Sequence, residues 1–207
     1  MTAAKSELTD LLDFAVDLAR GAGAITLKYF RRAPQTDTKA DGSFVTIADR
    51  ETEKFLRQSI SERFPDDGLL GEEEGEYNGS SERRWIVDPI DGTFSFVHGV
   101  PFYGVMIGLE IDGKACLGVV NLPALDEIVY AAKGVGCFYN GHAARVSKTA
   151  TLAESLLLST DFGTCAQYGF GVAAAELQRA ATTLHDADQA MKDAQREAER
   201  ILRPYRR

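Results

Sequence analysis

Residues 85–99 read WIVDPIDGTFSFVHG, and this stretch constrains the chain more than any other. Its apolar start fits a buried strand, which delivers two carboxylates, Asp88 and Asp91, within four residues. Carboxylates this close repel each other unless a cation neutralises them or one pKa rises. A hard dication, Mg²⁺ first among them, suits this pair together with a free main-chain carbonyl at Ile90.

The residues around the two acids add a second kind of ligand. Pro89 fixes φ and has no N–H, so the chain is expected to turn sharply there. Gly92 lets the backbone approach a ligand, and Thr93 is expected to cap a helix that begins near Phe94. Free N–H groups at that point favour a phosphate. Taken alone, Asp-Pro-x-Asp-Gly is more often an ordinary loop.

Two helices are expected before this stretch. Apolar residues recur at steps of three and four over residues 8–30, with Ser6 as candidate N-cap and Pro34 as the end of the segment. A second helix is expected to open at residues 45–49 and to end near Phe64, before a strong turn signal.

Two charged residues near the second helix allow both a structural and a functional interpretation. Asp49 lies in the first helical turn, where the helix dipole alone favours a carboxylate. Lys39 lies in the polar loop 36–43, where it either reaches a phosphate or metal-bound water or stays solvated.

Residues 69–73 are expected to form a short strand that ends in acids, followed by an exposed loop over 74–82. Consecutive residues of an extended strand point to opposite sides. Only one of Glu72 and Glu73 is therefore expected to face a metal directly.

The remainder of the first 150 residues predicts a sheet. Strands are expected at residues 103–110, 115–121, 127–132 and 137–139, with tight turns at Asp112-Gly113 and Asn140-Gly141. Closely spaced strands joined by hairpins make an antiparallel sheet, and the two helices before them make the fold class α+β.

The combined motifs resemble the inositol monophosphatase family of Mg²⁺-dependent phosphomonoesterases. The matching strings are Gly71-Glu72-Glu73, the stretch from Trp85 to Thr93, and FVHGVPF at 96–102. The resemblance implies a layered fold with a helix pair on an antiparallel sheet. It also implies Glu72, Asp88 and the Ile90 carbonyl as ligands of one Mg²⁺, and Asp88 and Asp91 as ligands of a second.

The same resemblance assigns further roles. Glu72, Thr93 and Asp49 would be catalytic, with Asp49 orienting the Thr93 hydroxyl toward the attacking water, and Glu73 would support Glu72. Ile90, Asp91, Gly92 and Thr93 would bind the substrate phosphate.

The resemblance fades toward the end of the chain. Three parts are expected: residues 1–150 as the α+β metal and phosphate domain, 151–183 as the start of a truncated αβα domain, and 184–207 as an atypical amphipathic helix. A Trp-Asp-x-Ala string, which supplies a third metal-binding Asp in the family, is missing.

Three functions remain open on these residues. Ser95 and the strings at 122–125 and 158–162 favour histidinol phosphate as the substrate, with inositol 1-phosphate as the alternative. The third possibility is a truncated, inactive module that binds metal, phosphate or another protein. A fragmentary second domain would also leave a sheet edge exposed, so a homo-oligomer is possible.

Composition excludes other partners. Net charge is −8, from 23 basic and 31 acidic residues, which argues against nucleic acid. No basic leader with an apolar core and no run of 18 apolar residues occurs, so no membrane contact and a cytoplasmic location are expected.

Overall fold

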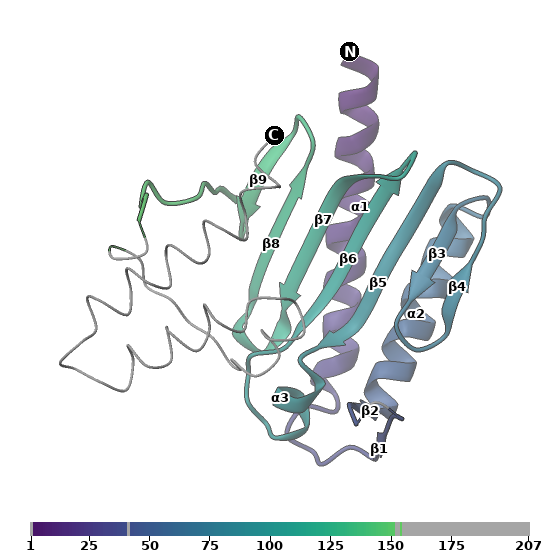
Figure 1. Ribbon diagram of the computed structural model, residues 1–207, viewed down its shortest axis with the longest axis vertical. Coiled ribbons are helices and arrows are strands. Elements are labelled where there is room, and N and C mark those ends of the chain that lie inside the picture. The colour runs from purple at the N-terminus through teal and green to yellow at the C-terminus, as the bar shows by residue number, and fades with distance from the viewer. Residues whose placement is uncertain (1, 41, 152–153, 155–207) are drawn as a thin grey trace. The chain divides into compact units, whose positions relative to one another are not determined.

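The computed structural model describes residues 2–40, 42–151 and 154. The chain divides into two compact units, residues 1–145 and 146–207, and every element discussed below belongs to the first (Figure 1). All of the expected αβα segment at 151–183 except residues 151 and 154, and the whole amphipathic helix expected at 184–207, lie outside the described residues. In the described part of the chain, no helix has the length and apolar character needed to cross a membrane.

Both expected helices are present, with corrected ends. Helix α1 runs from Thr2 to Leu27, so Ser6 lies inside it and is not its N-cap. Its end comes before Pro34 because the chain tightens into turns, in which Lys28 N donates to Ile25 O at 3.0 Å. Helix α2, Ile47–Arg63, ends next to Phe64 as predicted.

The strands form one eight-stranded sheet and a small two-stranded one. The large sheet has the order β10-β9-β8-β7-β6-β5-β3-β4, and β1 pairs with β2 separately. Their bounds are β1 Thr36–Thr38, β2 Phe44–Thr46, β3 Gly68–Gly71, β4 Gly75–Tyr77, β5 Arg83–Asp91, β6 Gly104–Ile111, β7 Lys114–Leu122, β8 Glu127–Ala132, β9 Gly136–Tyr139 and β10 His142–Ala143.

The predicted α+β class is confirmed. The prediction of a purely antiparallel sheet is wrong for one pair of strands. Strand β3 pairs with β5 in parallel, with Gly68 opposite Arg84 and Gly71 opposite Val87. The expected loop over 74–82 instead begins with β4, which returns antiparallel to β3. The parallel pair makes β3 and β5 end at the same edge, which brings Glu72 beside Asp88.

The core lies between the sheet and its helices, because α1 and α2 cover the same face of the sheet (Figure 1). Trp85 of β5 is completely buried and stacks on Phe64 at a ring distance of 5.5 Å. Its Nε1–H donates to Asp67 Oδ2 at 2.9 Å, so the one polar atom of this side chain is satisfied.

A smaller apolar cluster lies under the end of β5. Its buried members are Ala48, Ile90, Phe96 and Tyr103. Ile90 is 0% exposed and lies between the two candidate metal-binding acids in the sequence. Burial of this side chain anchors the end of β5.

Candidate metal and phosphate site

The end of β5 forms the centre of the site. Strand β5 loses its regular register with β6 between Asp88 and Asp91, the segment that contains Pro89. Ile90 N donates to Asp88 Oδ1 at 3.1 Å, a local turn that fixes the carboxylate of Asp88. The sharp turn expected between the two acids is therefore wrong: the strand continues through them, and only its register with β6 shifts.

Gly92 and Thr93 begin the short helix α3, Thr93–Val97. Gly92 is the N-cap with φ +84°, and a Cβ there would lie 3.1 Å from Phe102 O, so glycine fits both the conformation and the space. The expected capping by Thr93 is wrong, since no side chain caps this helix. Thr93 is the first helical residue, and its Oγ1 donates to Ile90 O at 3.0 Å.

This hydrogen bond also corrects the expectation of a free carbonyl at Ile90. A carbonyl oxygen has two lone pairs, and Thr93 uses one of them. Thr93 therefore occupies one of the two acceptor positions on Ile90 O.

Asp49 connects this loop to helix α2. Its Oδ1 lies 3.4 Å from Thr93 Oγ1, while its Oδ2 accepts from Thr46 N at 2.7 Å and Thr46 Oγ1 at 2.6 Å. Thr46 and Asp49 thus form a capping box, so the structural interpretation of Asp49 holds together with its contact to Thr93. Burial raises the pKa of Asp49 and the charge of Glu72 adds to the shift, whereas the Thr46 bonds oppose it.

Glu72 and Glu73 lie in the turn between β3 and β4, not in a strand. The argument that they must point to opposite sides therefore fails. Lys39 Nζ donates to Glu72 Oε1 and to Glu73 Oε1, each at 2.7 Å. Lys39 is thus not simply solvated, because its ammonium group forms ion pairs with both acids.

The acids influence one another as the sequence predicts. Burial raises the pKa of Asp88 to about 8, and the charges of Glu72 and Asp91 contribute to this shift. Burial likewise raises the pKa of Glu73, although Lys39 opposes it. Burial lowers the pKa of Lys39, but its bonds to Glu72 and Glu73 outweigh this and raise it overall.

The candidate metal ligands offer the oxygen atoms that a hard cation prefers. Their side chains are not grouped as a metal site, however. Carboxylate and carbonyl oxygens are the ligands that Mg²⁺ prefers. Within residues 2–40, 42–151 and 154, no three His, Cys, Asp or Glu side chains lie ready to hold a metal ion together. The bonds of Lys39 to Glu72 explain part of this, because they engage one of the candidate ligands.

A cavity of about 490 Å³ adjoins the acids. Its lining comes from the β1–β2 hairpin, helix α2 and the β3–β4 turn, and consists of Asp37, Thr38, Lys39, Val45, Arg50, Glu72, Glu73 and Glu74. Its volume is that of a small-molecule site. A ligand here would meet both the cations Lys39 and Arg50 and the acidic turn.

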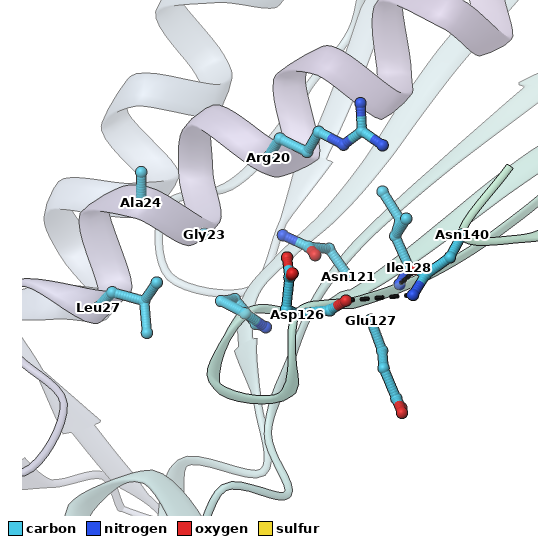
Figure 2. Close-up of a pocket in the computed structure, with 10 residues that line it drawn as sticks. Arg20, Gly23, Ala24, Leu27, Asn121, Asp126, Glu127, Ile128 and Asn140 are labelled. Atoms are coloured by element: carbon cyan, nitrogen blue, oxygen red, sulfur yellow. Dashed lines mark hydrogen bonds between the residues drawn. The ribbon is translucent and has the colours of Figure 1, made fainter.

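A second cavity, of about 420 Å³, lies between α1, the 3₁₀ helix Pro123–Leu125 and the ends of β7 and β8. Figure 2 shows Arg20, Asn121, Asp126 and Asn140 around it, with Asn140 Nδ2 donating to the Asp126 carbonyl at 3.2 Å. None of the predicted site residues lines this cavity. It therefore has no part in the site at the end of β5.

One residue that supports the site was not predicted. Glu53 of α2 is 0% exposed, and its carboxylate accepts hydrogen bonds from the N–H groups of Glu73 and Glu74. The only sequence signal is its spacing of four residues from Asp49, which places both acids on one face of α2.

The fold is a helix pair on a mixed sheet, and acidic residues cluster where β3 and β5 end. Comparison with known proteins identifies the class of protein that has these features. The model of the inositol monophosphatase family matches residues 7–199, and the chain belongs to this family. The family match therefore reaches into the segment 184–207, which was expected to be atypical.

Named relatives within the family differ in substrate. A histidinol-phosphatase from Chlorobaculum parvum is 51% identical over 155 residues, which cover 74% of this chain and 60% of that protein. A fructose-1,6-bisphosphatase/inositol-1-monophosphatase from Thermotoga maritima is 39% identical over 146 residues, covering 70% of this chain and 56% of the relative.

Solved structures show the same fold. An inositol monophosphatase from Zymomonas mobilis has a TM-score of 0.69 at 32% identity, over 82% of this chain and 65% of that one. The suhB protein from Bartonella henselae has a TM-score of 0.66 at 37% identity, over 69% of this chain and 57% of that one. The chain thus spans only about 60% of the curated relatives' length.

Proposed function

We propose that this chain hydrolyses a small-molecule phosphate monoester with the help of Mg²⁺. The observation that carries the proposal is the meeting of Asp88, whose raised pKa reflects burial and its acidic neighbours, with the Thr93–Asp49 pair at the end of β5. Glu72, Asp88, Asp91 and the Ile90 carbonyl would hold the metal. Bound Mg²⁺ would supply charge neutralisation and an acidified water.

The chain's own residues would bind the phosphate and direct the water. The N–H groups of Gly92 and Thr93 belong to the start of α3, where backbone donors have no partner within the helix. Thr93 Oγ1 would accept a proton from the attacking water while it passes its own proton to Asp49, whose Oδ1 lies 3.4 Å away. Ile90 and Asp91 would complete the phosphate-binding loop.

Histidinol phosphate is the substrate that we favour. Its support is the 51% identity to a histidinol-phosphatase, against 36–39% for the relatives named as inositol monophosphatases from Thermotoga maritima and tomato. Inositol 1-phosphate is the second candidate because those relatives cover 70–78% of this chain. A net charge of −8 fits a cytoplasmic enzyme of small molecules better than a nucleic-acid partner.

A module that binds metal or phosphate without turnover is the competing function. The observation in its favour is that the candidate metal ligands are not grouped as a metal site among the described residues, and Lys39 bonds to Glu72.

The decisive experiment measures phosphate release from histidinol phosphate and from inositol 1-phosphate, with and without Mg²⁺. Wild type is compared with Asp88→Asn and with the matched control Asp112→Asn, whose left-handed turn position also accepts asparagine. Release that requires Mg²⁺ and Asp88 but not Asp112 supports the phosphatase. A folded chain that binds Mg²⁺ and releases no phosphate supports the binding module instead.

A further inference from the structure

Glu53 is a buried charge with an unusual set of partners. Its Oε2 accepts from Glu73 N at 2.7 Å, and its Oε1 accepts from Glu74 N at 2.9 Å and from Arg57 Nε at 2.8 Å. A carboxylate that is 0% exposed needs such bonds to offset its lost hydration. Two of its three donors are backbone groups of the same turn.

That turn is the one that presents Glu72. Glu73 and Glu74 follow Glu72 directly, so fixing their N–H groups fixes the peptide on the carboxyl side of Glu72. Arg57 holds the other end of the turn, where its guanidinium donates to Gly75 O. The pair Glu53 and Arg57 therefore clamps the turn from helix α2.

The packing around Gly71 shows how closely the clamp fits. A Cβ on Gly71 would lie 2.2 Å from Glu53 Oε1 and 2.6 Å from an Arg57 nitrogen. Any side chain at the end of β3 would thus displace the turn or the ends of the Glu53 and Arg57 side chains. Glycine at this position allows the backbone and the buried carboxylate to approach each other.

Helix α2 consequently contacts both halves of the site through one face. Asp49, one turn before Glu53, reaches Thr93 at the start of α3, while Glu53 holds the β3–β4 turn. We propose that Glu53 is a positioning residue that sets the orientation of Glu72 relative to Asp88 and thereby the affinity for a divalent cation. This inference rests on the proposed function, in which Glu72 is a metal ligand.

The test substitutes Glu53 by Gln in the full chain and follows two signals. The amide keeps the shape of the side chain but can accept at only one of its two polar atoms. Hydrogen exchange of the Glu73 and Glu74 amides, measured by NMR, should accelerate at least about tenfold. Mn²⁺ affinity, measured by EPR titration, should weaken about 10–100-fold, as for residues that support metal ligands.

Asp67→Asn is the matched control. Asp67 is 3% exposed and accepts from Trp85 and Arg83, so its loss also removes buried hydrogen bonds, but away from the site. Its melting temperature should fall while its Mn²⁺ affinity stays within about twofold of wild type. Arg57→Gln is a second variant in case Glu53→Gln does not fold, and it should weaken Mn²⁺ binding in the same direction.

The outcomes separate this inference from the proposed function. Faster exchange at Glu73 and Glu74 with unchanged Mn²⁺ affinity would leave the phosphatase proposal intact and overturn the positioning role. Equal loss of affinity in Asp67→Asn would also overturn it, because general destabilisation would then explain both. A wild-type chain whose Mn²⁺ binding does not depend on Asp88 would overturn the proposed metal site and this inference together.

Discussion

The hydroxyl oxygen of Thr93 lies 3.4 Å from Oδ1 of Asp49, although 44 positions separate the two residues. The other oxygen of Asp49 accepts the N–H and hydroxyl of Thr46 at the start of α2. One buried carboxylate therefore joins the beginning of a helix to the loop that carries Asp88 and Asp91. The single hydroxyl proton of Thr93 has two acceptors within reach, Asp49 Oδ1 and, at the shorter distance of 3.0 Å, Ile90 O.

Replacing Thr93 by Val tests its proposed role in directing water. The isosteric side chain keeps its volume and loses the hydroxyl, so kcat should fall about 10²–10⁴-fold while KM changes little. Steady-state phosphate release measures both constants. The control is Thr36→Val, which removes a hydroxyl that donates to Pro34 O in the β1–β2 hairpin. A kcat within about threefold of wild type would assign Thr93 to the structure of the loop alone.

Asp88 should make the metal-free protein less stable as pH rises. Its pKa is raised from 3.8 to about 8 in the folded chain, chiefly by burial. A raised carboxyl pKa stabilises the folded state fully below the unfolded pKa, and this contribution is lost as pH rises through the folded pKa. The free energy of unfolding attributable to Asp88 should thus fall between about pH 4 and pH 8, by up to several kcal/mol.

Urea unfolding of metal-free wild type and Asp88→Asn at several pH values measures this effect. The amide oxygen can still accept from Ile90 N, so the variant removes the titration and keeps the turn. Its stability should depend less steeply on pH than that of wild type or Asp112→Asn. Parallel curves for all three proteins would show that Asp88 does not titrate in this range.

The sequence predicts the centre of the site better than its surroundings. Asp88, Ile90 and Asp91 are adjacent in the chain, and any strand that ends there brings them together. Glu72 approaches Asp88 because β3 and β5 pair in parallel. No local sequence pattern distinguishes this parallel pairing from the antiparallel pairing of a hairpin. The prediction that Thr93 caps α3 is wrong because Gly92, in a left-handed conformation, already occupies the N-cap.

Glu53 could not be predicted for a different reason. Glutamate in a helix normally faces water, and only the three-dimensional approach of the β3–β4 turn gives this one its partners. The prediction that Ser6 is the N-cap of α1 is wrong because the helix already includes residues 2–5. Their sequence, Thr-Ala-Ala-Lys, contains no residue that opposes a helix. Long-range contacts, rather than propensities, decided what the local patterns left open.

Lys39→Met should strengthen divalent cation binding. The ammonium group bonds to both Glu72 and Glu73 in this structure and is 23% exposed, so a cation must compete with it for the same oxygens. Removing it should tighten Mn²⁺ binding by up to about tenfold, equivalent to about 1.4 kcal/mol. The metal-free melting temperature should fall at the same time because the acids then repel each other.

EPR titration and thermal unfolding of the metal-free protein measure the two effects of Lys39→Met. Lys114→Met is the control, since it removes a lysine of the β6–β7 hairpin, remote in sequence from the acids. Weaker Mn²⁺ binding in Lys39→Met would show instead that Lys39 helps to hold the metal-bound arrangement.

Replacing Gly71 by Ala should lower the free energy of unfolding more than the same replacement at a glycine in an open part of the sheet. The new Cβ would lie 2.2 Å from Glu53 Oε1, and moving this buried carboxylate would break its hydrogen bonds to the Glu73 and Glu74 N–H groups. Overpacking of this kind costs about 1–3 kcal/mol. Gly118→Ala is the matched control, because a Cβ there has no atom within 4 Å and the backbone is not left-handed, so its effect should stay within about 0.5 kcal/mol. Urea unfolding of both variants compares them directly. If the two free energies of unfolding agree, the turn yields to the methyl group, and the close fit between Gly71 and Glu53 is not what holds Glu72 in place.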